Sequence, residues 1–217
     1  MDYALARRNM VESQLKPNKI IDERVIDAMS TVPRELFVPP RFRGVAYVDE
    51  DVPIADGRHL MEPTVLARLL QAARITDADA VAVIGCGTGY TAAVIAHLSN
   101  VVVAVESVAN LVDQASGILT QLGADNVVVM KGALDKGIPA QAPYDVIIVD
   151  GAVDEIPVAL THQLDMGGRL VAVVTDRVGL GIGTLVTRID GGFARQALFD
   201  ASVPRLPDFV VTPGFAF

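Results

Sequence analysis

From about Thr76 onward, short apolar runs alternate with longer amphipathic stretches. The runs are four to seven residues long, are rich in valine or isoleucine, and cover residues 80–84, 101–106, 127–130, 146–150 and 169–175. Strands that are apolar along their whole length are buried on both faces, and the parallel connections between them need a helical crossover. The alternation therefore predicts an α/β fold with a doubly wound, mostly parallel sheet.

A hairpin signal lies near the end of the chain. Residues 184–199 hold two strand-like runs around Asp190-Gly191-Gly192, a sequence typical of a tight turn between antiparallel strands. This pattern predicts an antiparallel hairpin at one edge and brings the sheet to about seven strands.

The N-terminal part lacks the alternation. Residues 2–14 and 22–31 are expected to be helical, whereas 32–63 contains several prolines and is expected to be irregular. We therefore expect the whole chain, residues 1–217, to form a single domain. It would consist of a helical and loop appendage at 1–75 and a cofactor-binding α/β core at 76–217.

Three glycines follow the first apolar run at the spacing Gly85-x-Gly87-x-Gly89, with Cys86 and Thr88 between them. Ligands of doubly wound sheets bind beyond the carboxyl ends of the strands, and glycine permits a sharp turn and a close approach of ligand to backbone. A dinucleotide fingerprint reads G-x-G-x-x-G, so the third glycine comes one residue early. The shorter loop favours a nucleoside with an amino-acid tail, and these five residues are candidate cofactor contacts.

Glu106 ends the second apolar run and is followed by Ser107. A carboxylate at this strand end accepts hydrogen bonds from both ribose hydroxyls of a bound nucleoside. The strand, the glycine loop and the acid at this spacing indicate a site for S-adenosyl-L-methionine, with Glu106 and Ser107 as cofactor-binding residues. The alternative is a tight turn that binds no ligand, with a solvated Glu106.

Two later strand ends are expected to border the same pocket. Gly132, Ala133 and Leu134 follow the third run and are expected to flank the adenine ring. Asp150 ends the fourth run and is expected to face the reactive methyl group. The predicted site thus gains three adenine contacts and one catalytic candidate.

Composition narrows the range of partners. The chain carries 18 basic and 26 acidic residues, a net charge of −8, whereas proteins that bind nucleic acid are usually basic. The most apolar window, 80–105, is interrupted by glycines and polar residues, and a membrane span needs about 20 apolar residues. Cys86 is the single cysteine, and the first residues lack the apolar region of a secretory signal. We expect a cytoplasmic protein that binds neither nucleic acid nor membrane, and the oligomeric state stays open.

Several longer motifs resemble one family, the protein-L-isoaspartate O-methyltransferases. They are "MVESQL" (10–15), "VIDAMSTVPRELFVPP" (25–40), "AYVDEDVPI" (46–54), "VAVIGCGTGYTAAVIAHL" (81–98) and "APYDVIIVDGAVDEIPVALTHQLDMGGRLV" (142–171). The resemblance covers roughly residues 8–175. It implies methyl transfer from S-adenosyl-L-methionine to the α-carboxyl group of an isoaspartyl residue in a damaged peptide or protein, as a repair step. S-adenosyl-L-homocysteine would be the product.

One segment departs from the family. Where the family reads approximately G-Q-T-I-S-Q-P, with the serine as its active-site residue, this chain has "GRHLMEP" at 57–63. Arg58 therefore replaces the glutamine, His59 the threonine and Met61 the serine, while Leu60 is an implied cofactor contact. A thioether donates no hydrogen bond, so Met61 is expected to pack against the cofactor. Arg58 is either a substitute carboxylate ligand or a solvated loop charge. With Asp150, these three replacements are the catalytic candidates.

Two further departures keep other functions open. Ala133 stands where the family has the aspartate of a Gly-Asp-Gly motif, and Asp150-Gly151 stands where it has threonine-alanine. One alternative is a cofactor-binding protein that acts through a partner surface without catalysis. Another is a metal-dependent small-molecule O-methyltransferase, in which Asp150 and Asp176 hold a divalent cation through oxygen ligands. In the isoaspartyl methyltransferase hypothesis, no residue is expected to bind a metal.

Overall fold

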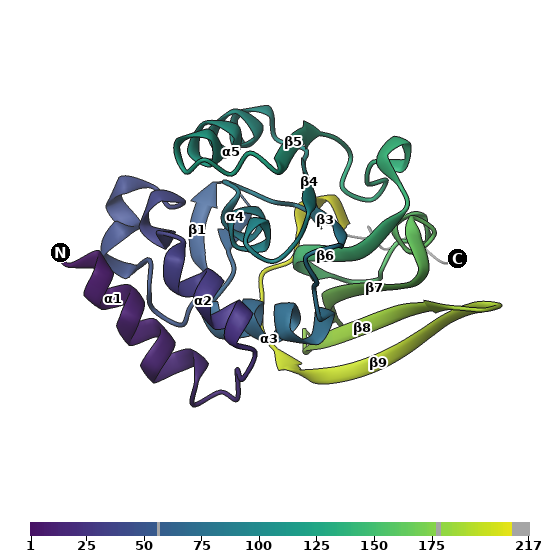
Figure 1. The fold of residues 1–217 in the computed structure, drawn as a ribbon, viewed down its shortest axis with the longest axis horizontal. Coiled ribbons are helices and arrows are strands. Elements are labelled where there is room, and N and C mark those ends of the chain that lie inside the picture. The colour runs from purple at the N-terminus through teal and green to yellow at the C-terminus, as the bar shows by residue number, and fades with distance from the viewer. Residues whose placement is uncertain (56, 177–178, 210–217) are drawn as a thin grey trace, which may run out of the picture.

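The computed structural model describes residues 1–55, 57–176 and 179–209. Within these residues, seven strands form one sheet in the order β5-β4-β3-β6-β7-β8-β9 (Figure 1). The strands are β3 (Ala80–Ile84), β4 (Val101–Glu106), β5 (Val127–Lys131), β6 (Tyr144–Val153), β7 (Leu164–Thr175), β8 (Gly181–Ile189) and β9 (Gly192–Ala201). The first five run parallel, and β8 and β9 are antiparallel. This arrangement confirms the predicted fold class.

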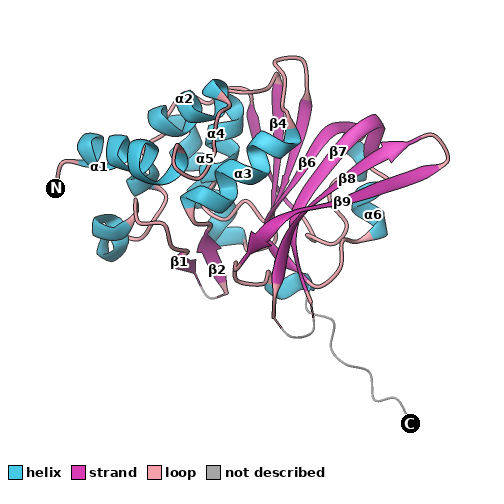
Figure 2. Cartoon of the chain, turned by 90° about the horizontal axis from the view of Figure 1, so that it is seen from below, coloured by secondary structure: helices cyan, strands magenta, loops and turns pink. Residues whose placement is uncertain are grey.

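The central strands are apolar because helices or loops cover both of their faces. Val81 and Val83 of β3 belong to one core cluster and Ala82 and Ile84 to the other, and each is at most 1% exposed. Figure 2 shows the helices α1 to α5 gathered on one side of the twisted sheet and α6 on the other. The helices are α1 (Tyr3–Met10), α2 (Glu23–Thr31), α3 (Pro63–Ala73), α4 (Tyr90–Ala96), α5 (Ala109–Gln121) and α6 (Val158–Thr161).

The N-terminal helices begin where side chains can cap them. Asp2 accepts a hydrogen bond from the backbone N–H of Leu5 at 2.9 Å, and Asp22 accepts from Arg24 at 3.0 Å. The helix predicted over 2–14 is present as α1 followed by a π-helical turn, Val11–Leu15. Both predicted N-terminal helices are therefore confirmed, with a change of helix type near the end of the first.

The segment expected to be irregular contains a small hairpin. β1 (Val52–Ala55) pairs antiparallel with β2 (Arg58–Leu60), and two short 3-10 helices, Arg34–Leu36 and Pro40–Val45, precede them. Strands of three and four residues that include Pro53 carry too little alternation to be predicted. This hairpin places the residues after Arg58 against the main sheet.

The N-terminal part and the sheet share one hydrophobic core. Met10, Met29 and Phe37 lie in the same buried cluster as Val81 and Val171 of the sheet. This shared core supports the prediction of a single domain, which stays a prediction. Among the described residues, no helix is both long enough and apolar enough to cross a membrane.

After the edge hairpin, the chain returns across the carboxyl end of the sheet. The backbone of Ala152 exchanges hydrogen bonds with Pro204 O at 3.1 Å and with Leu206 N at 2.8 Å. A short 3-10 helix, Pro207–Phe209, follows. We call residues 204–209 the return segment. It lies where ligands of parallel sheets bind.

Candidate active site

The glycine loop joins β3 to α4 in a conformation that glycine alone adopts easily. Gly85, Gly87 and Gly89 have φ values of 80°, 54° and 96°. A Cβ atom on Gly87 would lie 2.6 Å from Cδ1 of Ile54 in β1, so the hairpin packs directly on bare backbone. The loop is therefore both turned and closely approached, as its sequence predicts.

The other loop residues fix its position. The hydroxyl of Thr88 donates to the carbonyl of Phe37 at 2.6 Å, which ties the loop to the N-terminal part. A Cβ on Gly89 would lie 3.2 Å from Cβ of Ala115, so this glycine allows α4 to approach α5. Cys86 is 2% exposed, and burial raises the pKa of its thiol well above the usual range. Cys86 is thus a neutral, small loop residue.

Glu106 faces the glycine loop from the end of β4. The side chain is fully buried, and its Oε2 accepts from the backbone N–H of Gly87 at 3.0 Å. Oε1 accepts from the N–H groups of Ser107 at 2.8 Å and Val108 at 3.0 Å. Arg58 and the Ser107 hydroxyl also donate to Oε1, whereas Oε2 accepts the Gly87 bond and keeps an acceptor position for a hydroxyl donor.

Arg58 lies against Glu106 and is not a solvated charge. It is 3% exposed, and its Nη2 lies 3.2 Å from Oε1 of Glu106. The same nitrogen donates to Oγ of Ser107 at 2.9 Å and to Oδ2 of Asp208 in the return segment at 2.5 Å. The expectation of a solvated loop charge is therefore wrong, because the return segment covers this guanidinium. The structure brings Arg58 to the acid predicted for the ribose.

Leu60 and Met61 are buried beside this network, and His59 lies between Arg58 and Leu60 on β2. Met61 is 2% and Leu60 4% exposed. The carbonyl of Met61 accepts from Nη2 of Arg34 at 2.6 Å, so a buried guanidinium holds the backbone at this position. Nδ1 of His59 is buried and has no hydrogen-bond partner among the described residues, and burial lowers the pKa of the imidazole. His59 is thus a neutral ring with one free nitrogen.

Asp150 lies inside β6 and not at its end. Pairing with β7 continues through Ala152 and Val153, which extends the strand beyond the predicted boundary. Asp150 is 7% exposed; burial raises the pKa of its carboxyl from 3.8 to about 7, opposed by the nearby Thr91 hydroxyl and the charge of Arg34. The expected strand-end acid is therefore a buried group that changes charge near neutral pH.

Sequence reasoning missed the buried polar groups beside Asp150. Among the described residues, no hydrogen-bond partner is present for Nη1 of Arg34, Oη of Tyr90, Oγ1 of Thr91 or Oδ1 of Asp150. The guanidinium of Arg34 stacks on the Tyr90 ring at 4.9 Å. Buried polar atoms are normally paired, so this cluster has bonding capacity for a ligand or water. The available signal was a charged residue, Arg34, within the apolar motif "VPRELFVPP".

The residues predicted to flank the adenine ring also adjoin the glycine loop. The N–H of Gly132 donates to the carbonyl of Glu106 at 3.1 Å. Leu134 is fully buried, and its Cδ1 lies 3.4 Å from the position of a Cβ on Gly85. Ala133 is exposed. Gly132 and Leu134 thus adjoin the predicted cofactor site, whereas the side chain of Ala133 faces solvent.

The donor set of this site fits S-adenosyl-L-methionine. It contains a glycine cradle that side chains would fill, an oriented carboxylate at the next strand end, and apolar walls from Leu60 and Leu134. Within the described ranges, no three histidine, cysteine or acidic residues lie close enough together to hold a metal ion. That no metal is used stays a prediction.

A parallel sheet with a terminal antiparallel hairpin, a G-x-G-x-G loop after β3 and an acid at the end of β4 defines a class I methyltransferase. A solved structure named protein-L-isoaspartate O-methyltransferase matches with a TM-score of 0.80 at 26% identity, covering 92% of this chain and 65% of that chain. The chain belongs to the protein-L-isoaspartate(D-aspartate) O-methyltransferase family, whose model matches residues 6–192.

Curated relatives agree with this family. The Koribacter versatilis protein-L-isoaspartate O-methyltransferase is 44% identical over 172 residues, which cover 79% of this chain and 78% of the relative. The Methanoculleus marisnigri enzyme of the same name is 41% identical over 182 residues, covering 84% and 83%. A Plasmodium falciparum structure in complex with S-adenosyl-L-homocysteine has the same fold, with a TM-score of 0.78 at 19% identity, covering 95% of this chain and 98% of that chain. The predicted family and the use of S-adenosyl-L-methionine are confirmed.

Proposed function

We propose that this chain transfers the methyl group of S-adenosyl-L-methionine to the carboxylate of isoaspartyl residues in peptides and proteins. The observation that carries the proposal is the hydrogen bond between the loop N–H of Gly87 and the buried carboxylate of Glu106. This bond joins the two halves of the predicted cofactor site in a chain whose relatives are named for this activity.

The cofactor is held by the residues that surround this bond. When bound, it supplies a methyl group on a positively charged sulfur. Glu106 orients the ribose, the glycine loop accommodates the methionine part, and Ser107 lies beside the same carboxylate. The full set is Gly85, Cys86, Gly87, Thr88, Gly89, Glu106, Ser107, Gly132, Ala133, Leu134 and Leu60.

The acceptor needs orientation more than activation. A carboxylate is already ionised at neutral pH, so no strong base is required, and the site must align the acceptor and exclude water. Met61 and Leu60 are buried apolar groups that exclude water. Met61 offers no donor, and the free nitrogen of His59 supplies one in its place.

Arg58 and Asp150 set the charge of the site. Arg58 neutralises part of the negative charge of Glu106 and Asp208. Asp150 adds a carboxylate near the acceptor side that is half protonated at about pH 7. An ionised Asp150 repels the carboxylate acceptor, so the acceptor binds best when Asp150 is neutral.

Transfer of labelled methyl groups tests the proposed function. The enzyme and labelled S-adenosyl-L-methionine are incubated with an isoaspartyl peptide and with the same peptide containing ordinary aspartate. We expect label in the isoaspartyl peptide alone. If the cofactor binds in calorimetry but neither peptide is labelled, the chain is a cofactor-binding protein or methylates another acceptor.

A cytoplasmic location and a single functional domain are part of the same proposal. The single buried cysteine is compatible with the reducing cytoplasm as the site of action. The core shared by the N-terminal helices and the sheet supports one functional domain over residues 1–217.

A further inference from the structure

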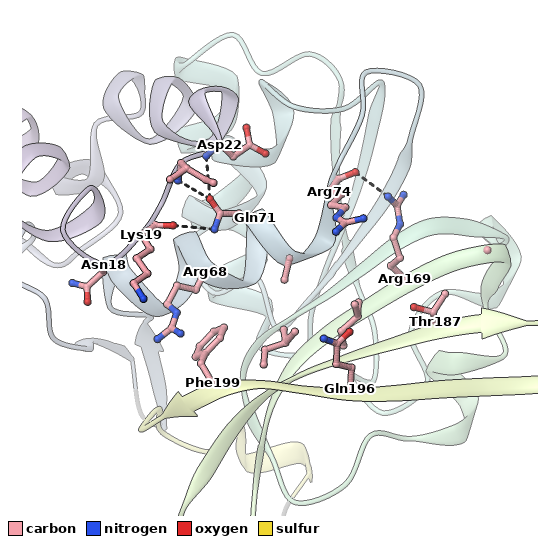
Figure 3. Close-up of a pocket in the computed structure, with 15 residues that line it drawn as sticks. Asn18, Lys19, Asp22, Arg68, Gln71, Arg74, Arg169, Thr187, Gln196 and Phe199 are labelled. Atoms are coloured by element: carbon pink, nitrogen blue, oxygen red, sulfur yellow. Dashed lines mark hydrogen bonds between the residues drawn. The ribbon is translucent and has the colours of Figure 1, made fainter.

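A groove lies on the surface between α3, the turn at residues 18–22 and the hairpin strands β8 and β9 (Figure 3). Its volume is about 830 Å³. Four of its lining residues are basic: Lys19, Arg68, Arg74 and Arg169. We call it the cationic groove. It lies beside the C-terminal part of α3, whereas the glycine loop lies at the carboxyl end of the sheet.

The groove is positive although the chain carries a net charge of −8. Among the described residues that line it, Asp22 is the single carboxylate, and that side chain caps α2 by accepting from the N–H of Arg24 at 3.0 Å. The groove thus carries four positive charges and one negative charge, and the negative charge already accepts a backbone hydrogen bond. Positive charges gathered in a concave surface attract an anionic ligand.

Most of these cations lack an acidic partner. Within the part of the chain that the structure describes, no carboxylate lies within 4.0 Å of the charged group of Lys19, Arg68 or Arg74. Arg169 pairs with Asp79 at 2.7 Å, but its Nε is buried and has no hydrogen-bond partner among the residues that the structure describes. Among the described residues, the cationic groove therefore has three cations without an acidic partner and one N–H donor, Nε of Arg169, without an acceptor.

The cations form two separated pairs. Figure 3 shows Lys19 and Arg68 at one end of the groove, beside Phe199, and Arg74 and Arg169 at the other. The Arg68 guanidinium stacks on the Phe199 ring at 3.9 Å, and the carbonyl of Arg74 accepts from Arg169 at 2.8 Å. Compact anions need converging donors. Two separated pairs fit an extended ligand that carries negative charges along its length.

The floor and rim suit a polypeptide. Gln196 of β9 lines the groove with an amide group, and Thr187 of β8 adds a hydroxyl group beside Arg169. In the sheet formed by the described residues, β9 is the edge strand, so one side of its backbone has no strand partner there. An acidic peptide would find donors for its carboxylates and groups that bond its backbone.

Helix α3 connects this groove to Met61 in the candidate active site. It begins at Pro63, two residues after Met61, and Arg68 and Arg74 follow Pro63 by five and eleven residues. At 1.5 Å per residue, these cations lie about 8 and about 16 Å further along the helix axis. An extended chain covers about 3.3 Å per residue, so a substrate segment of about five residues spans this separation.

We propose that the cationic groove binds an acidic stretch of the protein substrate, several residues away from the residue that is methylated. The inference rests on the proposed function, because it takes the methyl acceptor to be a polypeptide. The groove would thereby raise affinity for acidic substrates while leaving the chemistry to the active site.

Direct binding is the first test. The probe is a fluorescent peptide with two pairs of glutamates and ordinary aspartate, so that methylation plays no part. The variant Lys19→Gln/Arg74→Gln removes one exposed charge from each end, and Arg195→Gln is the matched control. Arg195 precedes Gln196 on β9, so its side chain points to the other face of the sheet.

We expect the dissociation constant of the probe to rise about fivefold in the double variant and to stay unchanged in the control. Salt should weaken binding to the unaltered protein. Equal binding by the double variant, or by a probe with glutamines in place of glutamates, would overturn the proposal. Binding of tripolyphosphate without binding of the probe would do so as well, because the groove would then be a compact anion site.

Methyl transfer provides the second test. Two isoaspartyl peptides are compared, one with a glutamate-rich tail about five residues from the isoaspartate and one with a glutamine-rich tail. We expect the acidic tail to lower KM several-fold in the unaltered enzyme and in Arg195→Gln, but not in Lys19→Gln/Arg74→Gln. Equal KM values in the unaltered enzyme would overturn the substrate role. If no peptide is methylated while the glutamate probe still binds, the proposed function fails and the groove remains an acidic-peptide site.

Discussion

The guanidinium of Arg58 lies 3.2 Å from the carboxylate of Glu106, and both side chains are buried. Glu106 is the residue that orients the ribose in the proposed site, so a bound cofactor must share this carboxylate with an internal cation. Asp208 of the return segment binds the same guanidinium. Residues 58, 106 and 208 thus connect the hairpin β1–β2, the sheet and the return segment at one point.

Removal of Arg58 is expected to destabilise the fold. The substitution Arg58→Ala leaves Glu106 buried without its cation, and breaking such a pair costs about 3 kcal/mol. The free energy of unfolding from urea titration measures the loss. In the double variant Arg58→Ala/Glu106→Gln the buried charge is absent, so this variant should lose less than the sum of the two single changes. Strict additivity would show that the pair does not couple.

Restoring a hydroxyl at position 61 is expected to raise isoaspartyl activity. The family serine can donate to an acceptor carboxylate, whereas the Met61 thioether cannot. Met61→Ser should raise kcat/KM for an isoaspartyl peptide about tenfold, since one hydrogen bond to a charged group is worth about 1.5–3 kcal/mol. The smaller side chain should also lower stability by about 2 kcal/mol, because Met61 is 2% exposed. A folded variant without any gain in kcat/KM would show that Met61 does not limit the activity.

His59 is expected to provide the donor that position 61 lacks. Its Nδ1 is buried without a partner in the described part of the chain, and the lowered pKa keeps the ring neutral at pH 7. His59→Ala should raise KM for the isoaspartyl peptide about tenfold with little change in cofactor affinity. His59→Asn, which keeps a donor, should restore part of the loss. Equal KM values for the alanine variant and the parent would exclude this role.

Asp150 is expected to control the pH dependence of transfer. Burial raises the pKa of this carboxyl to about 7, so it is neutral below that pH and negative above it. Because the ionised form repels a carboxylate acceptor, kcat/KM should fall about tenfold as the pH rises through 7. Asp150→Asn should abolish this fall. A profile that is the same in both proteins would assign the titration to another group.

The same carboxyl has a consequence for stability. Its pKa is higher in the folded state than the 3.8 of an exposed aspartate, so its contribution to stability is greatest below pH 4 and is lost as the pH rises to about 7. Asp150→Asn should therefore gain stability relative to the parent at pH 8 but not at pH 4, which denaturant titration at both values measures.

The central sheet was predictable because its strands are short and buried on both faces. β3 and β4 have the predicted boundaries, Ala80–Ile84 and Val101–Glu106. β6 and β7 are longer than predicted, because pairs outside the apolar runs, such as Tyr144 with Leu164 and Ala152 with Val173, extend them across irregular positions that hold Gly151 and Gly167. Local pattern identified the strands, and tertiary pairing determined the ends of the longer ones.

The candidate site was predictable where one short motif carries it. The glycine loop and Glu106 meet as their spacing predicts, because adjacent parallel strands end at the same edge. The partners of Arg58 were not predictable, since Asp208 lies 150 residues away and no local pattern links them. The buried cluster around Arg34 was not predictable either, because its members come from separate elements of the fold.

Calorimetric titration with S-adenosyl-L-homocysteine tests the central claim most directly. We expect tight binding to the unaltered protein and at least about tenfold weaker binding to Glu106→Gln, which loses the charge that the ribose hydroxyls and the loop N–H of Gly87 share. Asp113→Asn, an exposed change on α5, is the matched control and should bind as the parent does. Equal affinity of Glu106→Gln and the parent, or no heat with the unaltered protein, would show that Glu106 and the glycine loop do not hold the cofactor.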